Sequence, residues 1–62
     1  MPNVFIQWLE GKKKEQKQTV VDGVVKAMEK AGIDKEAVVV SFIETSPDNI
    51  SKGGVFFSER GK

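Results

Sequence analysis

The chain is organised around the segment at residues 14–31, which reads KEQKQTVVDGVVKAMEKA. Apolar side chains recur in it at steps of three and four, which is the spacing of an amphipathic helix. Gly32 suits the left-handed position just past a helix end, so we expect the helix to stop there, with Ile33 folded back on its last turn. The apolar stripe consists of Val20, Val21, Val24, Val25, Ala27, Met28 and Ala31.

Two local features weaken this helix. Gly23 in its interior costs roughly 1 kcal/mol relative to alanine. No Ser, Thr, Asp or Asn precedes the first turn, so the usual kind of N-cap side chain is missing.

Segments on both sides of the helix have the composition of β-strands. Residues 2–9, PNVFIQWL, and residues 38–45, VVVSFIET, are rich in β-branched and aromatic side chains. A strand–helix–strand crossover of this length makes the strands parallel and the connection right-handed. Alternation puts on one face Val4, Ile6, Trp8, Val38, Val40 and Phe42, and on the other Phe5, Leu9, Val39 and Ile43.

The carboxy-terminal segment predicts a short hairpin. Residues 46–49, SPDN, are a turn signal, and Gly53-Gly54 most simply makes the turn that starts the hairpin. A short apolar run, Val55-Phe56-Phe57, follows it. Residues 1–62 therefore read as a single α/β domain, a β-α-β unit with a short C-terminal hairpin.

This arrangement leaves apolar surface that one chain cannot cover. One helix covers one face of a two-stranded sheet, and the face that carries Phe5 and Ile43 stays open. A chain of 62 residues buries only ~60% of the surface that its unfolded form exposes, and without cysteine it has no disulfide to compensate. We therefore expect it to associate with copies of itself or with a close relative.

Composition narrows the classes of partner. The net charge of +1 creates no field that would draw nucleic acid or a membrane surface, and the three lysines at 12–14 supply few phosphate contacts. No signal-like apolar region and no run near ~18 apolar residues is present, so we expect a cytoplasmic location by default. The chain has neither histidine nor cysteine, so we expect no metal site of the usual kind.

Pro2, directly after the initiator methionine, has two interpretations. In the structural one, proline opens a strand because it has no N–H to give to a ladder. In the chemical one, removal of Met1 leaves Pro2 as a free secondary amine, which can act as a base or a nucleophile.

Several short motifs occur in order along the chain: Met1-Pro2, Leu9-Glu10-Gly11 followed by the basic Lys12, Glu15-Gln16-Lys17, Phe42-Ile43-Glu44 and Gly53-Gly54. Each is weak alone, but together, at this spacing and in a chain of this length, they are specific. Through them the chain resembles the small-subunit 4-oxalocrotonate tautomerases over essentially its whole length. The resemblance implies β-α-β units that pair into a dimer with a four-stranded sheet, three of which form a hexamer.

The resemblance also implies a chemistry. Pro2, exposed after removal of Met1, would be the general base that carries a proton between the enol and keto forms of a small carboxylic acid, without any cofactor. An α-amine has a pKa of about 8, and an apolar wall or a nearby cation lowers that pKa. Lys12 could supply the cation, and the wall could come from Trp8, Ile50 and Phe56 or Phe57.

At the positions that the resemblance assigns to substrate binding, the chain has Leu9, Lys12, Val39 and Ile50. Lys12 stands where well-characterised tautomerases have arginine, and it lacks the bidentate fork of a guanidinium. Val39 aligns with the family's second substrate-binding arginine, and Ile50 with a pocket-lining aromatic residue that a small glycine follows, here Ser51. A monocarboxylic enol or 2-oxo acid is therefore favoured over a dicarboxylate.

Two functions remain open at this point. The first is an isomerase, with Pro2 as base and Lys12 as carboxylate anchor. The second is a non-catalytic homologue that acts as a structural partner subunit.

Overall fold

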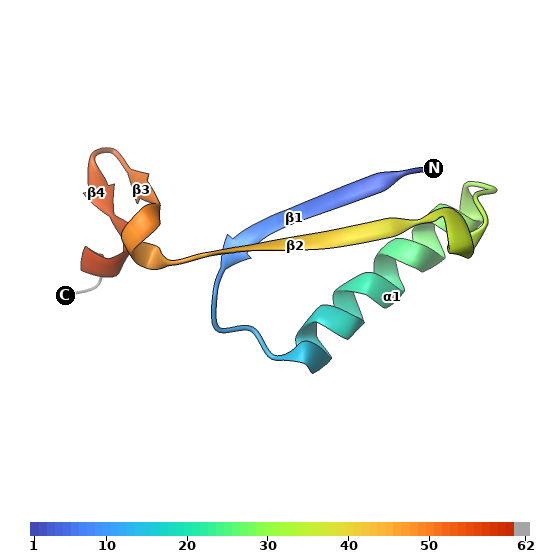
Figure 1. Ribbon diagram of the computed structural model, residues 1–62, viewed down its shortest axis with the longest axis horizontal. Coiled ribbons are helices and arrows are strands. Elements are labelled where there is room, and N and C mark those ends of the chain that lie inside the picture. The colour runs from blue at the N-terminus through green and yellow to red at the C-terminus, as the bar shows by residue number, and fades with distance from the viewer. Residues whose placement is uncertain (61–62) are drawn as a thin grey trace.

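The computed structural model describes residues 1–60 and consists of a β-α-β unit followed by a small hairpin (Figure 1). Its helices and strands are β1 (Asn3–Leu9), α1 (Lys14–Lys30), β2 (Val39–Thr45), β3 (Ser51–Lys52) and β4 (Val55–Phe56). Short 3-10 turns η1, η2 and η3 lie at Lys35–Ala37, Pro47–Asn49 and Phe57–Glu59. The α/β class and the β-α-β order expected from the sequence are confirmed. Residues 61–62 of the expected domain lie outside the described residues.

The two long strands and the helix are each one residue shorter than expected. Pro2, Ala31 and Val38 each lie just outside the strand or helix to which the sequence pattern assigned them. Pro2 has no N–H for the ladder, Ala31 is the C-cap of α1, and Val38 closes the turn η1.

The two long strands form a parallel pair, as predicted. The register runs from Asn3 opposite Val39 to Leu9 opposite Thr45. Pro2 extends the pair at one end, because its carbonyl oxygen accepts a hydrogen bond from the Val39 N–H at 3.0 Å. Pro2 therefore takes part in the sheet through its acceptor alone.

Both ends of α1 are closed by local hydrogen bonds. At the start, the Gln16 side-chain oxygen accepts from the Lys13 N–H at 2.8 Å, which is the bond that the third helical residue makes in a capping box. At the end, the N–H groups of Gly32 and Ile33 donate to the carbonyls of Glu29 and Met28 at 2.9 and 3.0 Å. This pair of bonds is a Schellman motif, and it confirms the expected helix stop.

One face of the sheet packs against α1. Trp8 and Phe42 stack in this layer, with ring centroids 5.0 Å apart and planes 23° from parallel. The apolar stripe of α1 is narrower than the sequence pattern indicates, because Ala27 and Ala31 are exposed. The half-buried side chains of the layer are Val4, Ile6, Trp8, Val20, Val21, Val24, Val25, Met28, Val40 and Phe42.

The opposite face of the sheet is open, as the alternation predicts. Phe5 is 67% exposed and Ile43 47%, and Val39 is exposed beside them, whereas Leu9 at the strand end is half-buried. None of the residues 1–60 is fully buried in the single chain. Within this described part, no helix is long and apolar enough to span a membrane.

The hairpin extends beyond the end of β2, away from the helix and at the opposite end of the molecule from the amino terminus (Figure 1). Lys52 pairs with Val55 around Gly53-Gly54, which confirms the expected turn. The molecule is elongated as a result, with a radius of gyration of 15.0 Å. A compact chain of this length would have about 11 Å.

We expect the protein in solution to be an assembly several times heavier than the 6.9 kDa chain. Phe5→Asp should shift light scattering toward smaller species, because it places an unpaired charge in the apolar face that association would cover. Thr19→Asp adds the same charge at an exposed position of α1 and should leave the mass unchanged. A wild-type monomer at micromolar concentration would contradict this expectation.

Candidate active site

Pro2 is held in place by its carbonyl group and leaves its nitrogen outside the sheet. The carbonyl bond to the Val39 N–H fixes the residue at the start of β1. Met1, attached to the Pro2 nitrogen, is 83% exposed. Removal of Met1 would therefore cost little packing.

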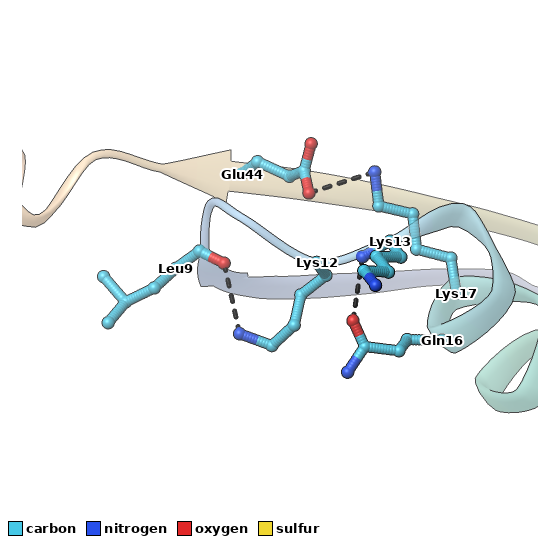
Figure 2. A network of polar contacts seen from close by, with 6 residues as sticks. All are labelled: Leu9, Lys12, Lys13, Gln16, Lys17 and Glu44. Carbon is cyan, nitrogen blue, oxygen red and sulfur yellow. Dashed lines mark hydrogen bonds and ion pairs between the residues drawn. The ribbon is translucent and has the colours of Figure 1, made fainter.

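Lys12 returns to the end of β1 because the chain turns sharply at Gly11. Gly11 has φ +106°, a backbone conformation that residues with a Cβ atom rarely adopt. After this turn the Lys12 ammonium group donates to the Leu9 carbonyl oxygen at 3.4 Å (Figure 2). The same nitrogen lies 5.3 Å from the centre of the Trp8 ring, within the range of a cation–π contact.

The nearby carboxylate of Glu44 is occupied by a different lysine. Lys17, in the first turns of α1, pairs with it at 3.0 Å. Figure 2 shows the Lys17 ammonium directed to Glu44 and that of Lys12 directed to Leu9. Lys12 forms no ion pair with any of the residues 1–60, so its charge can meet a ligand carboxylate.

A single chain does not bring the expected site residues together. Pro2 lies beside Val39 at one end of the sheet, and Lys12 contacts Leu9 at the other. At about 3.3 Å per strand residue, Pro2 and Leu9 are separated by about 23 Å. Ile50 lies past the end of β2, where its carbonyl accepts from the Phe57 N–H at 2.9 Å. The apolar wall expected around Pro2 is thus not supplied by Trp8, Ile50, Phe56 or Phe57 of the same chain.

Two features near the Lys12 end of the sheet could not be predicted from the sequence. One is the contact between Trp8 and Lys12, whose only signal is their spacing of four residues around a glycine. The other is a groove of about 300 Å³ between the start of α1 and β2, lined by Lys14, Lys17, Gln18, Val21 and Phe42. Among the described residues, no cluster of three or more His, Cys, Asp or Glu could hold a metal ion.

Comparison with known proteins places this geometry in a family. The family described as Tautomerase enzyme matches residues 2–60. The chain belongs to this tautomerase family. Its membership and its β-α-β fold support a tautomerase-like, isomerase-type function. No curated protein matches the chain.

Solved structures, several of them described as 4-oxalocrotonate tautomerases or their homologues, are similar to this chain over nearly its whole length. A 4-oxalocrotonate tautomerase isozyme from Methylibium petroleiphilum is 35% identical to this chain. The match covers 98% of this chain and 100% of that chain, with a TM-score of 0.87. DmpI from Helicobacter pylori is 30% identical, with coverages of 92% and 97% and a TM-score of 0.80. TomN, a 4-oxalocrotonate tautomerase homologue in the tomaymycin biosynthetic pathway, is also 30% identical, with coverages of 95% and 92% and a TM-score of 0.86.

Two Gly→Ala substitutions should change stability in opposite directions. Neither at Gly11 nor at Gly23 would an added Cβ meet another atom within 4 Å, so backbone conformation decides the sign. Gly11→Ala should lower the free energy of unfolding by roughly 1–3 kcal/mol, because φ +106° is strained for alanine. Gly23→Ala should raise it by about 1 kcal/mol, because alanine favours a helix interior.

Thermal unfolding at equal protein concentration measures both effects, since the stability of an assembly depends on concentration. Equal melting temperatures for the two variants would contradict the role assigned to the Gly11 turn.

Proposed function

We propose that this protein is a tautomerase that moves a proton between the enol and keto, or dienol and enone, forms of a small carboxylic acid. The observation that carries the proposal is the state of Pro2. It is the first residue bonded into the sheet, it is bonded only through its carbonyl, and its nitrogen is attached to an exposed Met1. In a tautomerase-family chain, cleavage of the Met1–Pro2 peptide bond would turn that nitrogen into a basic amine.

Pro2 is the general base after removal of Met1. While Met1 remains, the Pro2 nitrogen is a tertiary amide without a basic lone pair. The freed α-amine has a pKa of about 8 in water, and an apolar or cationic surrounding lowers that pKa toward neutrality. A base with a pKa near the operating pH transfers protons most effectively.

The proposed reaction is balanced within the substrate and the amine. The neutral Pro2 nitrogen accepts the enol hydroxyl proton, and the O–H electrons form the carbonyl as the C=C electrons move toward carbon. The resulting ammonium returns a proton to that carbon, so the enzyme ends unchanged. No other reactant is needed.

Lys12 is the carboxylate anchor in this proposal. Its ammonium has no carboxylate partner among the described residues and keeps N–H donors for a ligand. A charge-assisted bond to the substrate carboxylate binds it and also stabilises negative charge that develops during proton transfer. Leu9, Val39 and Ile50 are the proposed apolar contacts of the substrate, and with one cation in place of two a monocarboxylate is favoured.

The proposed site needs more than one copy of the chain. Pro2 and Lys12 lie at opposite ends of the same strand, so a substrate that touches both would bridge two chains. We propose that the copies pair into a four-stranded sheet and that three such dimers form a hexamer. The cytoplasmic location remains a prediction.

A structural partner subunit is the second candidate function. The observation that favours it is Val39, an apolar residue beside Pro2 where the resemblance implies a cation. Proton exchange on a panel of 2-oxo and enol acids, with protein whose amino terminus is verified by intact mass, separates the two. Proton exchange faster than in buffer alone supports the enzyme, whereas exchange at the buffer rate supports the structural subunit.

Pro2→Ala should reduce tautomerase activity at least ~10²-fold, the lower end of what a positioned general base contributes. Trimming then leaves a primary amine with different basicity and more freedom about φ. Assembly should survive because no ladder donor is lost. A chain that keeps Met1 should be impaired more severely, because its amide nitrogen accepts no proton. Full activity in either variant, with assembly intact, would make Pro2 a structural proline.

Lys12→Ala should raise the KM for a monocarboxylate enol roughly tenfold or more, with a smaller effect on kcat, because a charge-assisted hydrogen bond to substrate is lost. Lys12→Arg should retain or improve the KM, because it restores the bidentate fork. Lys13→Ala, next in sequence and exposed, is the matched control and should leave both constants unchanged. Identical kinetics for wild type and Lys12→Ala would place Lys12 in a solvated loop.

A further inference from the structure

Trp8 presents the face of its ring to the one cation in the proposed site. The Lys12 nitrogen lies 5.3 Å from the ring centre, and its only hydrogen-bond acceptor among residues 1–60 is the Leu9 carbonyl, at a long 3.4 Å. The Leu9 bond alone is therefore weak. The ring contributes the second of the two contacts that locate the ammonium group.

The Trp8 ring is itself held by a residue of the neighbouring strand, on the same face of the sheet. It stacks on Phe42 of β2 at 5.0 Å, and Phe42 is placed by its register with Ile6. Opposite Trp8 in the register is Glu44, whose carboxylate pairs with Lys17 and is not drawn to Lys12. The arrangement thus holds the ring and keeps a competing anion away.

Packing alone does not account for an indole at this position. The Trp8 Nε1–H is buried and has no acceptor among the described residues, which costs free energy. Phenylalanine would give the stack on Phe42 without burying an unpaired donor. What tryptophan adds is the stronger cation–π face.

Lysine needs such help more than arginine does. Its ammonium is a point charge on a flexible four-carbon stem, whereas a guanidinium is a rigid fork that is already shaped for a carboxylate. An ordering contact near the end of the stem reduces the conformational freedom that is lost when a carboxylate binds.

We propose that Trp8 is a positioning residue, which orients the Lys12 ammonium for the substrate carboxylate through a cation–π contact. The proposal rests on the proposed function for the role of Lys12, but the contact and its effect on carboxylate binding can be measured without turnover. It also predicts that affinity and stability respond differently at this position. A purely structural Trp8 would move both together.

The first measurement is NMR of the assembled protein, without Met1, in which the lysine ε-methylene groups carry ¹³C. The ring current of Trp8 should shift the Lys12 ε-protons upfield of the other lysines, with the signal assigned from its absence in Lys12→Ala. The shift should vanish in Trp8→Leu and persist in part in Trp8→Phe. A Lys12 signal at the position of the exposed lysines would overturn the proposal.

The second measurement is the Kd of 3-phenylpropanoate, a monocarboxylate without the enol or 2-oxo group that the proposed reaction needs, followed by the same signals or by calorimetry. Trp8→Leu should weaken binding about two- to fivefold, the range of an exposed cation–π contact. In the Lys12→Ala background Trp8→Leu should have no further effect. The neutral 3-phenylpropanamide should bind equally to wild type and both Trp8 variants.

Trp8→Phe keeps the test valid if Trp8→Leu fails to assemble. It should be at least as stable as wild type, because the unpaired N–H is gone, and yet bind the carboxylate more weakly. The proposal is overturned if the Trp8 and Lys12 substitutions weaken carboxylate binding additively. It is also overturned if the Trp8 substitutions weaken binding of the amide as much as that of the carboxylate, or if the carboxylate binds wild type no more tightly than Lys12→Ala. If wild type shows no turnover but the Trp8 and Lys12 substitutions change carboxylate binding as expected, the tautomerase function is refuted and the positioning role stands.

Discussion

A sheet of two strands has two faces, and this chain has one helix with which to cover them. That shortage governs the rest of the structure. The helix side is only half-buried, the other side displays Phe5 and Ile43, and no described residue is fully enclosed. Burial of apolar surface is the main favourable term in folding. We therefore expect a chain with so much apolar surface left open to gain part of its stability from association with other copies.

The length of the strands has a comparable effect on the chemistry. Pro2 is the proposed base and Lys12 the proposed carboxylate anchor, and the full length of β1 separates them. Each end is well organised locally. Pro2 is held through its carbonyl, and Lys12 is returned by the Gly11 turn to Leu9 and Trp8. Neither end holds both groups, so the association that we propose for the open face would also be what brings Pro2 of one copy to Lys12 of another.

The parts of this structure that repeat or alternate could be predicted from the sequence. The helix, the parallel strands, the stop at Gly32 and the open face with Phe5 follow from periodicity and from backbone preferences, which act over a few residues. Contacts that depend on where a long side chain comes to rest could not be predicted. The Gln16 side chain accepts from the Lys13 N–H at the start of the helix, Lys12 lies over Trp8, and Lys17 pairs with Glu44. The distance between Pro2 and Lys12 was implicit in a seven-residue strand, but site residues inferred by resemblance carry no distances.

The distance along β1 has a consequence for how such a protein can evolve. After a gene duplication, one copy could lose the residues at the Pro2 end and the other those at the Lys12 end, and a mixed assembly would still contain complete sites. Each product would look degenerate when judged by its own sequence. Val39 and Ile50 stand where the resemblance implies other residues, so under the proposed assembly the number of intact sites would depend on which chains assemble together.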